Sequence, residues 1–306
     1  MAWILGIAFD SRAENKPTVA LILSGEPGPH ARKLQTSSDI HVRVLDREGA
    51  MRALRKGEIQ VIVSEKSGKI LIELDPANQE ASTIKLKVEK VLSERKAEIQ
   101  IENLSAPGSR YIDFLVPGLL GMGVMNACMW GTGWVMIEFR MKKLLRAMIA
   151  ASMNKVHFLV SFFVSRVIFN FLESGILILF AYFYFGLKLQ GSWFALMLAM
   201  LSGLIAFSGI AVLGASRANN TQVANGVLNA VTLPSMVLSG VFFNYHNFPD
   251  WIVPIVQYFP LTLLADSVRS VFIEGAGPAD ILLPSMILSA MGLFFGAIGL
   301  RVYRWY

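Results

Sequence analysis

The chain has 306 residues, of which 54% are hydrophobic and only 16% are charged, and its mean hydropathy is +0.51. A soluble globular domain carries about 25% charged residues, so this composition argues against a wholly soluble protein. Of the 28 Lys/Arg and 22 Asp/Glu residues, 17 and 15 lie within residues 1–110. The first third of the chain therefore has the composition of a soluble domain, and residues 111–306 have that of a membrane protein.

The same composition excludes several classes of function. The net charge is +6 and the isoelectric point about 9.4, but the surplus cations lie between hydrophobic runs, which indicates membrane orientation and argues against nucleic-acid binding. The one cysteine, Cys128, lies in an apolar run, and the four histidines show no ligand spacing. We therefore expect no disulfide framework, no metal and no cofactor. The sequence has no G-x-x-x-x-G-K-[ST] motif, so a P-loop ATP site is excluded.

Residues 1–9, MAWILGIAF, are apolar but too short to cross a bilayer. At about 1.5 Å per residue they cover less than half of the roughly 30 Å hydrocarbon core. We interpret them as the end of a first transmembrane helix whose start lies upstream, and a hydrophobic N-terminal strand or anchor is the alternative.

Residues 10–110 are predicted to form a small α/β domain. Runs rich in β-branched residues predict strands, and the segments of mixed charge between them predict helices. The expected strands are residues 19–24, 40–45, 61–64 and 69–74, and the expected helices are residues 30–36, 47–56 and 81–97.

Residues 111–306 contain five segments that are long and apolar enough to cross a membrane, which requires about 20 residues. Only the second carries charges, Arg166 and Glu173. The five expected spans are residues 114–137, 157–185, 192–216, 223–243 and 281–300.

The short loops between these spans give the orientation, because cytoplasmic loops are enriched in Lys and Arg. The loops of one side carry Arg140, Lys142, Lys143, Arg146, Lys155, Arg217, Arg301 and Arg304. The opposite loops carry only Lys188 and Arg269. We therefore expect an α-helical polytopic membrane protein with five full spans, a truncated first span and a small extracytoplasmic α/β domain. Residues 10–110 are placed outside and the C-terminus in the cytoplasm.

The loop 138–155 between the first two of these spans is basic and amphipathic. Its apolar residues recur at helical spacing, and its basic residues lie on the other faces. The apolar residues are Met141, Leu144, Leu145 and Met148. A basic amphipathic helix can rest at lipid headgroups or dock on a cytoplasmic partner, and a plain positively charged loop is the alternative.

Several short motifs follow one another in the second part of the chain. They are YIDFLVPG at 111–118, followed by Leu119, Met122 and Met125; RMKKLLR at 140–146, followed by HFL at 157–159; LPSMVLSGVFF at 233–243; FPDW at 248–251; and PLT at 260–262, followed by Asp266, Arg269, Glu274 and Gly275. In order and spacing, from about residue 110 to the C-terminus, they resemble the ABC type-2 exporter permeases, the membrane-spanning subunits of ATP-binding-cassette exporters of drugs and lipids.

The resemblance implies a permease of the bacterial cytoplasmic (inner) membrane that dimerises, contacts membrane lipid and pairs with a separate ATPase subunit. The chain itself would be no enzyme, and its uncharged spans suit a hydrophobic or amphipathic cargo moving outward. The residues expected to couple the permease to the ATPase are Arg140, Lys142, Lys143, Leu144, Arg146 and Ser152. One departure from the family is Ala151-Ser152 in place of Thr-Pro, where Ser152 can cap the following helix.

The resemblance also assigns residues 244–277 to short re-entrant helices that cap the outer end of the pathway. The residues expected in the pathway or its gating are Glu173, Pro234, Gly240, Pro260, Asp266 and Arg269. Pro234 removes one backbone hydrogen bond and favours a kink, with packing alone as the alternative.

Glu173 is the one acid deep in a span, so it requires a partner or a place facing the protein interior. Arg166 lies on the same face, roughly 10 Å away along the axis, without direct contact. A structural link to Arg166 through other polar groups and a role in the pathway or a dimer interface both stay open for Glu173.

A membrane-anchored receptor or scaffold that binds its ligand through residues 10–110 is the alternative function. It accounts for the α/β domain but gives the segments 233–243 and 260–262 no purpose. A neighbouring gene that encodes a Walker A motif would favour the exporter, and an adjacent signalling domain would favour the receptor.

Overall fold

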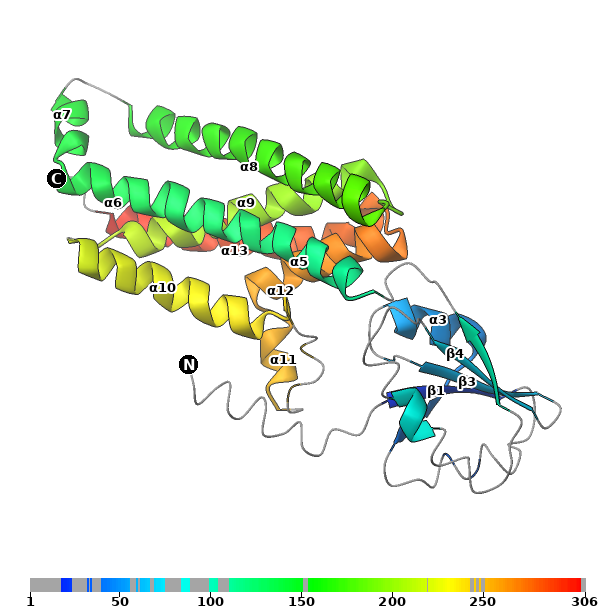
Figure 1. Cartoon of the computed structure of the whole chain (residues 1–306). Coiled ribbons are helices and arrows are strands. Elements are labelled where there is room, and N and C mark those ends of the chain that lie inside the picture. Colours follow the sequence, from blue (N-terminus) through cyan, green and yellow to red (C-terminus); the bar gives the residue numbers. More distant parts are fainter. Residues whose placement is uncertain are drawn as a thin grey trace. The chain divides into compact units, whose positions relative to one another are not determined.

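The computed structural model describes residues 18–23, 32, 34, 40–55, 59, 61–66, 69–74, 84–88, 99–103, 110–150, 154–218, 220–242, 245, 248 and 251–303. The contacts divide the chain into two compact units, Met1–Phe114 with His246–Pro249 and Leu115–Tyr245 with Asp250–Tyr306. The first is an α/β unit and the second is a helical unit (Figure 1). The segment 1–9, expected to belong to a first span, lies outside the described residues.

The α/β unit contains a five-stranded mixed sheet in the order β2-β1-β3-β4-β5. Its strands are β1 (Thr18–Leu23), β2 (His41–Val44), β3 (Val61–Lys66), β4 (Lys69–Leu74) and β5 (Ile99–Asn103). β1 is parallel to β2 and β3, β4 is antiparallel to β3, and β5 is parallel to β4. Helix α3 (Arg47–Arg55) covers one face, and Leu34, Ile84 and Val88 cover the other. Burial on both faces explains the nearly continuous apolar run of β1 and the apolar residues 61–63 that begin β3.

The four expected strands are confirmed to within two residues as β1 to β4, and the helix expected at 47–56 is confirmed as α3. Of the helices expected at 30–36 and 81–97, only residues 32, 34 and 84–88 are described, and these are helical. Strand β5 was not predicted, because Gln100, Glu102 and Asn103 make its sequence IQIEN largely polar.

The helical unit consists of α5 (Tyr111–Asn126), η2 (Ala127–Gly133), α6 (Trp134–Met141), α7 (Leu144–Ala150), α8 (Lys155–Phe185), α9 (Trp193–Ala215), α10 (Thr221–Leu238), α11 (Val253–Val256), α12 (Pro260–Arg269), η4 (Ser270–Glu274) and α13 (Pro278–Val302). Both η2 and η4 are π-helical, and α5, η2 and α6 form one continuous run. Helix α9 packs against η2, α12 and α13. In Figure 1, α8 and α10 lie on opposite sides of this unit, and α7 lies at one end, called the α7 end below.

Among the described residues, four helical runs are long and apolar enough to cross a membrane. They are Tyr111–Met141, His157–Phe185, Trp193–Ala215 and Pro278–Val302, and they correspond to four of the five expected spans. The other expected span, 223–243, corresponds to α10, which has 18 residues, ends at Leu238 and is not among the four. The count of five spans therefore stays a prediction.

Helices α9 and α13 approach each other closely through glycine. A Cβ atom on Gly209 would overlap the backbone of Gly292, and a Cβ atom on Gly292 would overlap the backbone of Ile205. Small residues allow the backbones of membrane helices to meet in this way. The α9–α13 pair therefore forms the centre of the helical unit, and α12 packs on both of its helices.

The amphipathic helix expected over 138–155 is wrong as one continuous helix. Helix α6 ends at Met141, Lys143 adopts a left-handed conformation with φ 58°, and α7 begins at Leu144. A non-glycine residue at positive φ is unfavourable, and the buried position of Leu145 in the core cluster offsets that cost. The periodicity predicted that Leu144 and Leu145 both belong to the apolar face of this segment. Leu145 is 1% exposed but Leu144 is 41% exposed, so Leu144 does not belong to the buried face of α7.

The segment expected at 244–277 contains α11, α12 and η4. Pro260 is the first residue of α12, and Gly275, with φ 77°, ends η4. Four apolar residues of this segment are buried, namely Leu264, Val268, Val271 and Phe272. The re-entrant position of this segment in a membrane stays a prediction.

Candidate functional site

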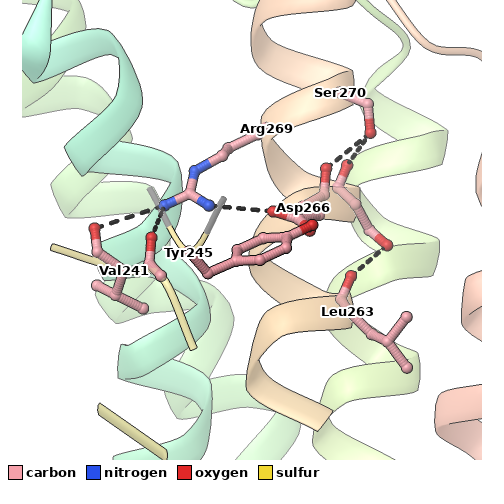
Figure 2. A network of polar contacts seen from close by, with 8 residues as sticks. Val241, Tyr245, Leu263, Asp266, Arg269 and Ser270 are labelled. Carbon is pink, nitrogen blue, oxygen red and sulfur yellow. Dashed lines mark hydrogen bonds and ion pairs between the residues drawn. The ribbon is translucent and has the colours of Figure 1, made fainter. Parts of the chain in front are cut away.

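Arg269, in the last turn of α12, is the centre of a polar network at the end of α10 (Figure 2). Its Nη2 donates hydrogen bonds to the carbonyl oxygens of Gly240 at 2.7 Å and Val241 at 3.4 Å. Its Nη1 donates to Oδ1 of Asp266 at 3.1 Å, and the Tyr245 hydroxyl donates to Oδ2 of Asp266 at 2.9 Å. One guanidinium therefore joins the end of α10 to α12. We call these five residues the Arg269 network.

The backbone at the end of α10 explains why a cation is bound there. Gly240 has φ 73°, a left-handed conformation that ends the helix and is common at glycine. The chain turns out of the helix at this point, and the carbonyl oxygens of Gly240 and Val241, which follow the C-cap Ser239, both accept hydrogen bonds from Arg269.

Helix α5 also approaches the Arg269 network. A Cβ atom on Gly118 would lie 3.0 Å from Nη2 of Arg269 and 3.2 Å from the carbonyl oxygen of Val241. This glycine belongs to the VPG sequence of α5. Three helices, α5, α10 and α12, therefore meet at one guanidinium group.

The electrostatics of the network depend on the burial of Arg269, which is only 8% exposed. Burial lowers the pKa of its guanidinium, and the Asp266 carboxylate and Tyr245 oppose that shift. Removing one partner of a buried, hydrogen-bonded charge is strongly destabilising, because the remaining groups lose their partners without regaining water. The arrangement binds helices together and has no group placed as a nucleophile.

The other residues expected in the pathway lie elsewhere. Pro234 lies inside α10 and Pro260 begins α12, so both belong to helices of the Arg269 network but supply none of its hydrogen bonds. Glu173 lies on α8 and is exposed. Among the described residues of this one chain it has neither an interior position nor a bonded partner, so its role in the pathway or a dimer interface stays a prediction. Glu173 is exposed because α8 has few neighbours: only 17% of its most apolar 18-residue stretch is buried inside the protein.

The α7 end presents a basic surface, which we call the α7 surface and define as Lys142, Lys143 and Leu144. All three side chains are exposed, and Nζ of Lys142 donates to Oε1 of Glu138 at 2.6 Å. On its other face, α7 inserts Leu145 into a cluster with residues of α6, α8, α9 and α10. The side chain of Arg146 and all of Ser152 lie outside the described part of the chain.

Arg140 is half-buried and, unlike the residues of the α7 surface, forms its contacts within the helical unit. Its guanidinium donates to the carbonyl oxygens of Ala215 and Ser216 at the end of α9, in the latter case at 2.9 Å. It also lies 4.7 Å from the ring centroid of Tyr303, whose hydroxyl donates to the Met136 carbonyl oxygen at 3.2 Å. Burial raises the pKa of Tyr303, and the Arg140 cation opposes that shift. We call these five residues the Arg140 cluster, and it joins α6, α9 and the end of α13.

The structure brings Gly240, Asp266 and Arg269, three of the residues assigned to the pathway or its gating, into one network, and their role in gating stays a prediction. Sequence reasoning missed Tyr245 and Tyr303, because their contacts depend on how distant helices meet. Gly118 carried a usable signal, since it ends the VPG motif already singled out at the start of α5.

The chain has apolar helical runs, an α/β unit and networks that bind helix ends. This combination defines a polytopic membrane protein. Among the described residues, no group of three or more His, Cys, Asp or Glu is placed to hold a metal ion. The chain belongs to the ABC-2 transporter family: the family described as "ABC-2 family transporter protein" matches residues 1–301. No curated protein and no solved structure matches the chain. The chain is therefore a multi-pass membrane permease, of a family whose permeases work with ATP-binding-cassette ATPase subunits.

Proposed function

We propose that this chain is the permease subunit of an ABC exporter of the bacterial cytoplasmic membrane. It would act as a homodimer with a separate ATPase subunit and move a hydrophobic or amphipathic substrate outward. The observation that carries the proposal is the two-sided construction of α7. Lys142, Lys143 and Leu144 are exposed, whereas Leu145 is fixed in the core of the helical unit.

A two-sided helix of this kind suits the transmission of force. Movement of the ATPase against the α7 surface would displace Leu145 and, with it, the packing of α6, α8 and α9. The Arg140 cluster would pass that displacement to the ends of α9 and α13. Because α12 packs on both α9 and α13, the movement would reach the Arg269 network.

In this proposal the α7 end is cytoplasmic and the α/β unit lies outside, as the distribution of Lys and Arg predicts. The Arg269 network would gate the outer part of the pathway by holding α12 against the end of α10. Its hydrogen bonds would have to break if α10 and α12 separate.

The experiment that tests the proposal is co-purification of the full-length chain from native membranes. We expect a Walker-motif ATPase to co-purify with the wild type and to be lost in the double variant Lys142→Glu/Lys143→Glu. Lys188→Glu is the matched control, because Lys188 is also exposed but lies in the loop between α8 and α9. Recovery of no ATPase, even after crosslinking, would overturn the proposal and favour a receptor or scaffold.

A further inference from the structure

The loop between α8 and α9 is bonded to the end of η4 through its backbone. Its residues 190–192, which we call the strap, come directly before α9. Their three consecutive N–H groups donate, in order, to the carbonyl oxygens of Phe272 at 3.3 Å, Val271 at 2.9 Å and Ala276 at 3.5 Å. Neither the Arg269 network nor the Arg140 cluster includes the strap. It is therefore a second attachment of the α12–η4 segment, and the function proposed above does not use it.

Gly191 allows the strap to approach η4 so closely. A Cβ atom on Gly191 would lie 2.6 Å from the carbonyl oxygen of Ala276 and 2.7 Å from that of Val271, so a side chain does not fit there. Val271 and Phe272 are buried. If the strap left η4, their carbonyl groups would lose their partners at buried positions, which is unfavourable.

Helix α9 is bonded to neighbouring elements at both of its ends. Ser192, the last residue of the strap, is its N-cap, and the Oγ atom of Ser192 accepts a hydrogen bond from the Phe194 N–H at 3.2 Å. At the other end of α9, the carbonyl oxygens of Ala215 and Ser216 accept hydrogen bonds from Arg140. Because the strap continues directly into α9, a displacement of α9 would carry η4 with it.

The attachment of α12 to the end of α10 is of a different kind. Its bonds run from the Arg269 side chain to the carbonyl oxygens of Gly240 and Val241, and from Tyr245 to Asp266. The ion pair between Arg269 and Asp266 lies within α12, so it stays intact when α12 moves away from α10. The buried guanidinium therefore keeps a charged partner after separation, and the Asp266 side chain, which is 40% exposed, is already in contact with water.

From this contrast we infer that the outer gate opens between α10 and α12, while the strap holds α12 and η4 to α9. The inference rests on the proposed function in one respect, namely that α12 moves during transport. Helix α9, the strap, η4 and α12 then move as one body. The hydrogen bonds from Arg269 to Gly240 and Val241 are the ones that break and form again, and Gly191 is a positioning residue that keeps η4 on α9.

Hydrogen–deuterium exchange of the full chain in detergent distinguishes the two attachments without an ATPase. In Arg269→Met, exchange should accelerate in peptides that contain Ser239 and stay unchanged in peptides that contain the strap. In Gly191→Ala, exchange should accelerate in the strap by about tenfold or more, the size expected for losing one backbone hydrogen bond, and stay unchanged at Ser239. Gly226→Ala is the control, because Gly226 has open space around it, and it should leave both regions as in the wild type.

Two results of this experiment would overturn the inference. One is acceleration of the strap together with Ser239 in Arg269→Met, because the two attachments would then open as one. The other is a strap in the wild type that exchanges as fast as an unfolded peptide. Both results come from the wild type and Arg269→Met, so they decide the question even if Gly191→Ala does not fold.

A disulfide across the strap tests whether it stays closed during ATP hydrolysis. A Cβ atom on Gly275 would lie 4.0 Å from the Cβ atom of Gln190, within the roughly 3.5–4.5 Å that a disulfide requires. In a Cys128→Ser background, Gln190→Cys/Gly275→Cys is purified together with the ATPase. Its rate of ATP hydrolysis should be the same before and after reduction with dithiothreitol, as in the single variant Gln190→Cys, which is the control.

A rate of ATP hydrolysis that rises on reduction in the double variant alone would overturn the inference, because the strap would then have to open in each cycle. Recovery of no ATPase would count against the proposed exporter, and the exchange experiment would still decide whether the strap and the Arg269 network open separately. The failure of one proposal is therefore distinguishable from the failure of the other.

Discussion

Replacing Arg269 by methionine should weaken the attachment of α12 to the end of α10. Methionine keeps much of the apolar stem but loses the hydrogen bonds to the Gly240 carbonyl and to Asp266. A hydrogen bond from a charged group contributes about 1.5–3 kcal/mol, and an ion pair with a partly exposed carboxylate contributes at most about 1 kcal/mol. The Asp266 side chain is 40% exposed, so the smaller value applies to that pair. The total is about 2–4 kcal/mol, or roughly 30- to 700-fold in the equilibrium between attached and detached α12.

Hydrogen–deuterium exchange measures this change directly. In Arg269→Met, amide exchange should accelerate in peptides that contain Ser239 or α12, by up to the same factor, and should stay unchanged in α9. Arg217→Met is the matched control, because Arg217 is exposed in the turn after α9 and should leave exchange in both regions as in the wild type. Arg269→Lys should lie between the two, since lysine keeps the charge but has one donor group in place of a fork. Unchanged exchange at α12 in Arg269→Met would show that the Arg269 hydrogen bonds do not hold α12 to the end of α10.

Three further predictions follow from other contacts. Gly292→Ala should lower the melting temperature of the solubilised protein, because overpacking at the α9–α13 contact costs about 1–3 kcal/mol. Gly226→Ala is the control and should not lower it, because Gly226 has open space around it. Equal melting temperatures of the two variants would contradict the close packing of α9 and α13. Cys128 is fully buried, so a water-soluble maleimide should label it only after denaturation in SDS, and rapid labelling of the native protein would show that η2 is open. Tyr303→Phe removes the hydroxyl that donates to the Met136 carbonyl but keeps the ring under Arg140. The amount of substrate transported per ATP hydrolysed should therefore fall, while the free energy of unfolding changes by only about 1 kcal/mol. An unaltered ratio of transport to ATP hydrolysis would exclude the Arg140 cluster from coupling.

The apolar helices were predictable from the sequence because length and composition largely determine them. The predicted ends of 157–185 and 192–216 agree with α8 and α9 to within two residues. The break at Lys143 was not predictable, because a lysine at positive φ is imposed by packing of Leu145 and not by local preference. The spacing of the apolar residues alone therefore predicted one helix where the structure has a turn at Lys143 between α6 and α7.

The candidate site shows the same limit. The motifs selected Gly240, Asp266 and Arg269, but the bonds that join them run largely to backbone carbonyl groups, which every residue has and no side-chain pattern reveals. The exposure of Glu173 was not predictable from the sequence, because the neighbours of a largely apolar helix decide which of its sides is exposed. In the sequence, Arg140 is one of several cations in the same loop. Only the fold shows that its guanidinium is bonded to the end of α9, whereas Lys142 and Lys143 are exposed.

The most direct test of the account is a crosslink between the α7 surface and an ATPase. Cys128→Ser leaves the chain without cysteine, so Leu144→Cys introduces a single exposed thiol at the α7 surface. With a thiol-to-amine crosslinker in native membranes, we expect a covalent product between position 144 and a Walker-motif ATPase. Lys188→Cys in the same background should give no such product. Capture of the ATPase from position 188, or from neither position, would contradict the claim that α7 is where ATP hydrolysis is coupled to transport.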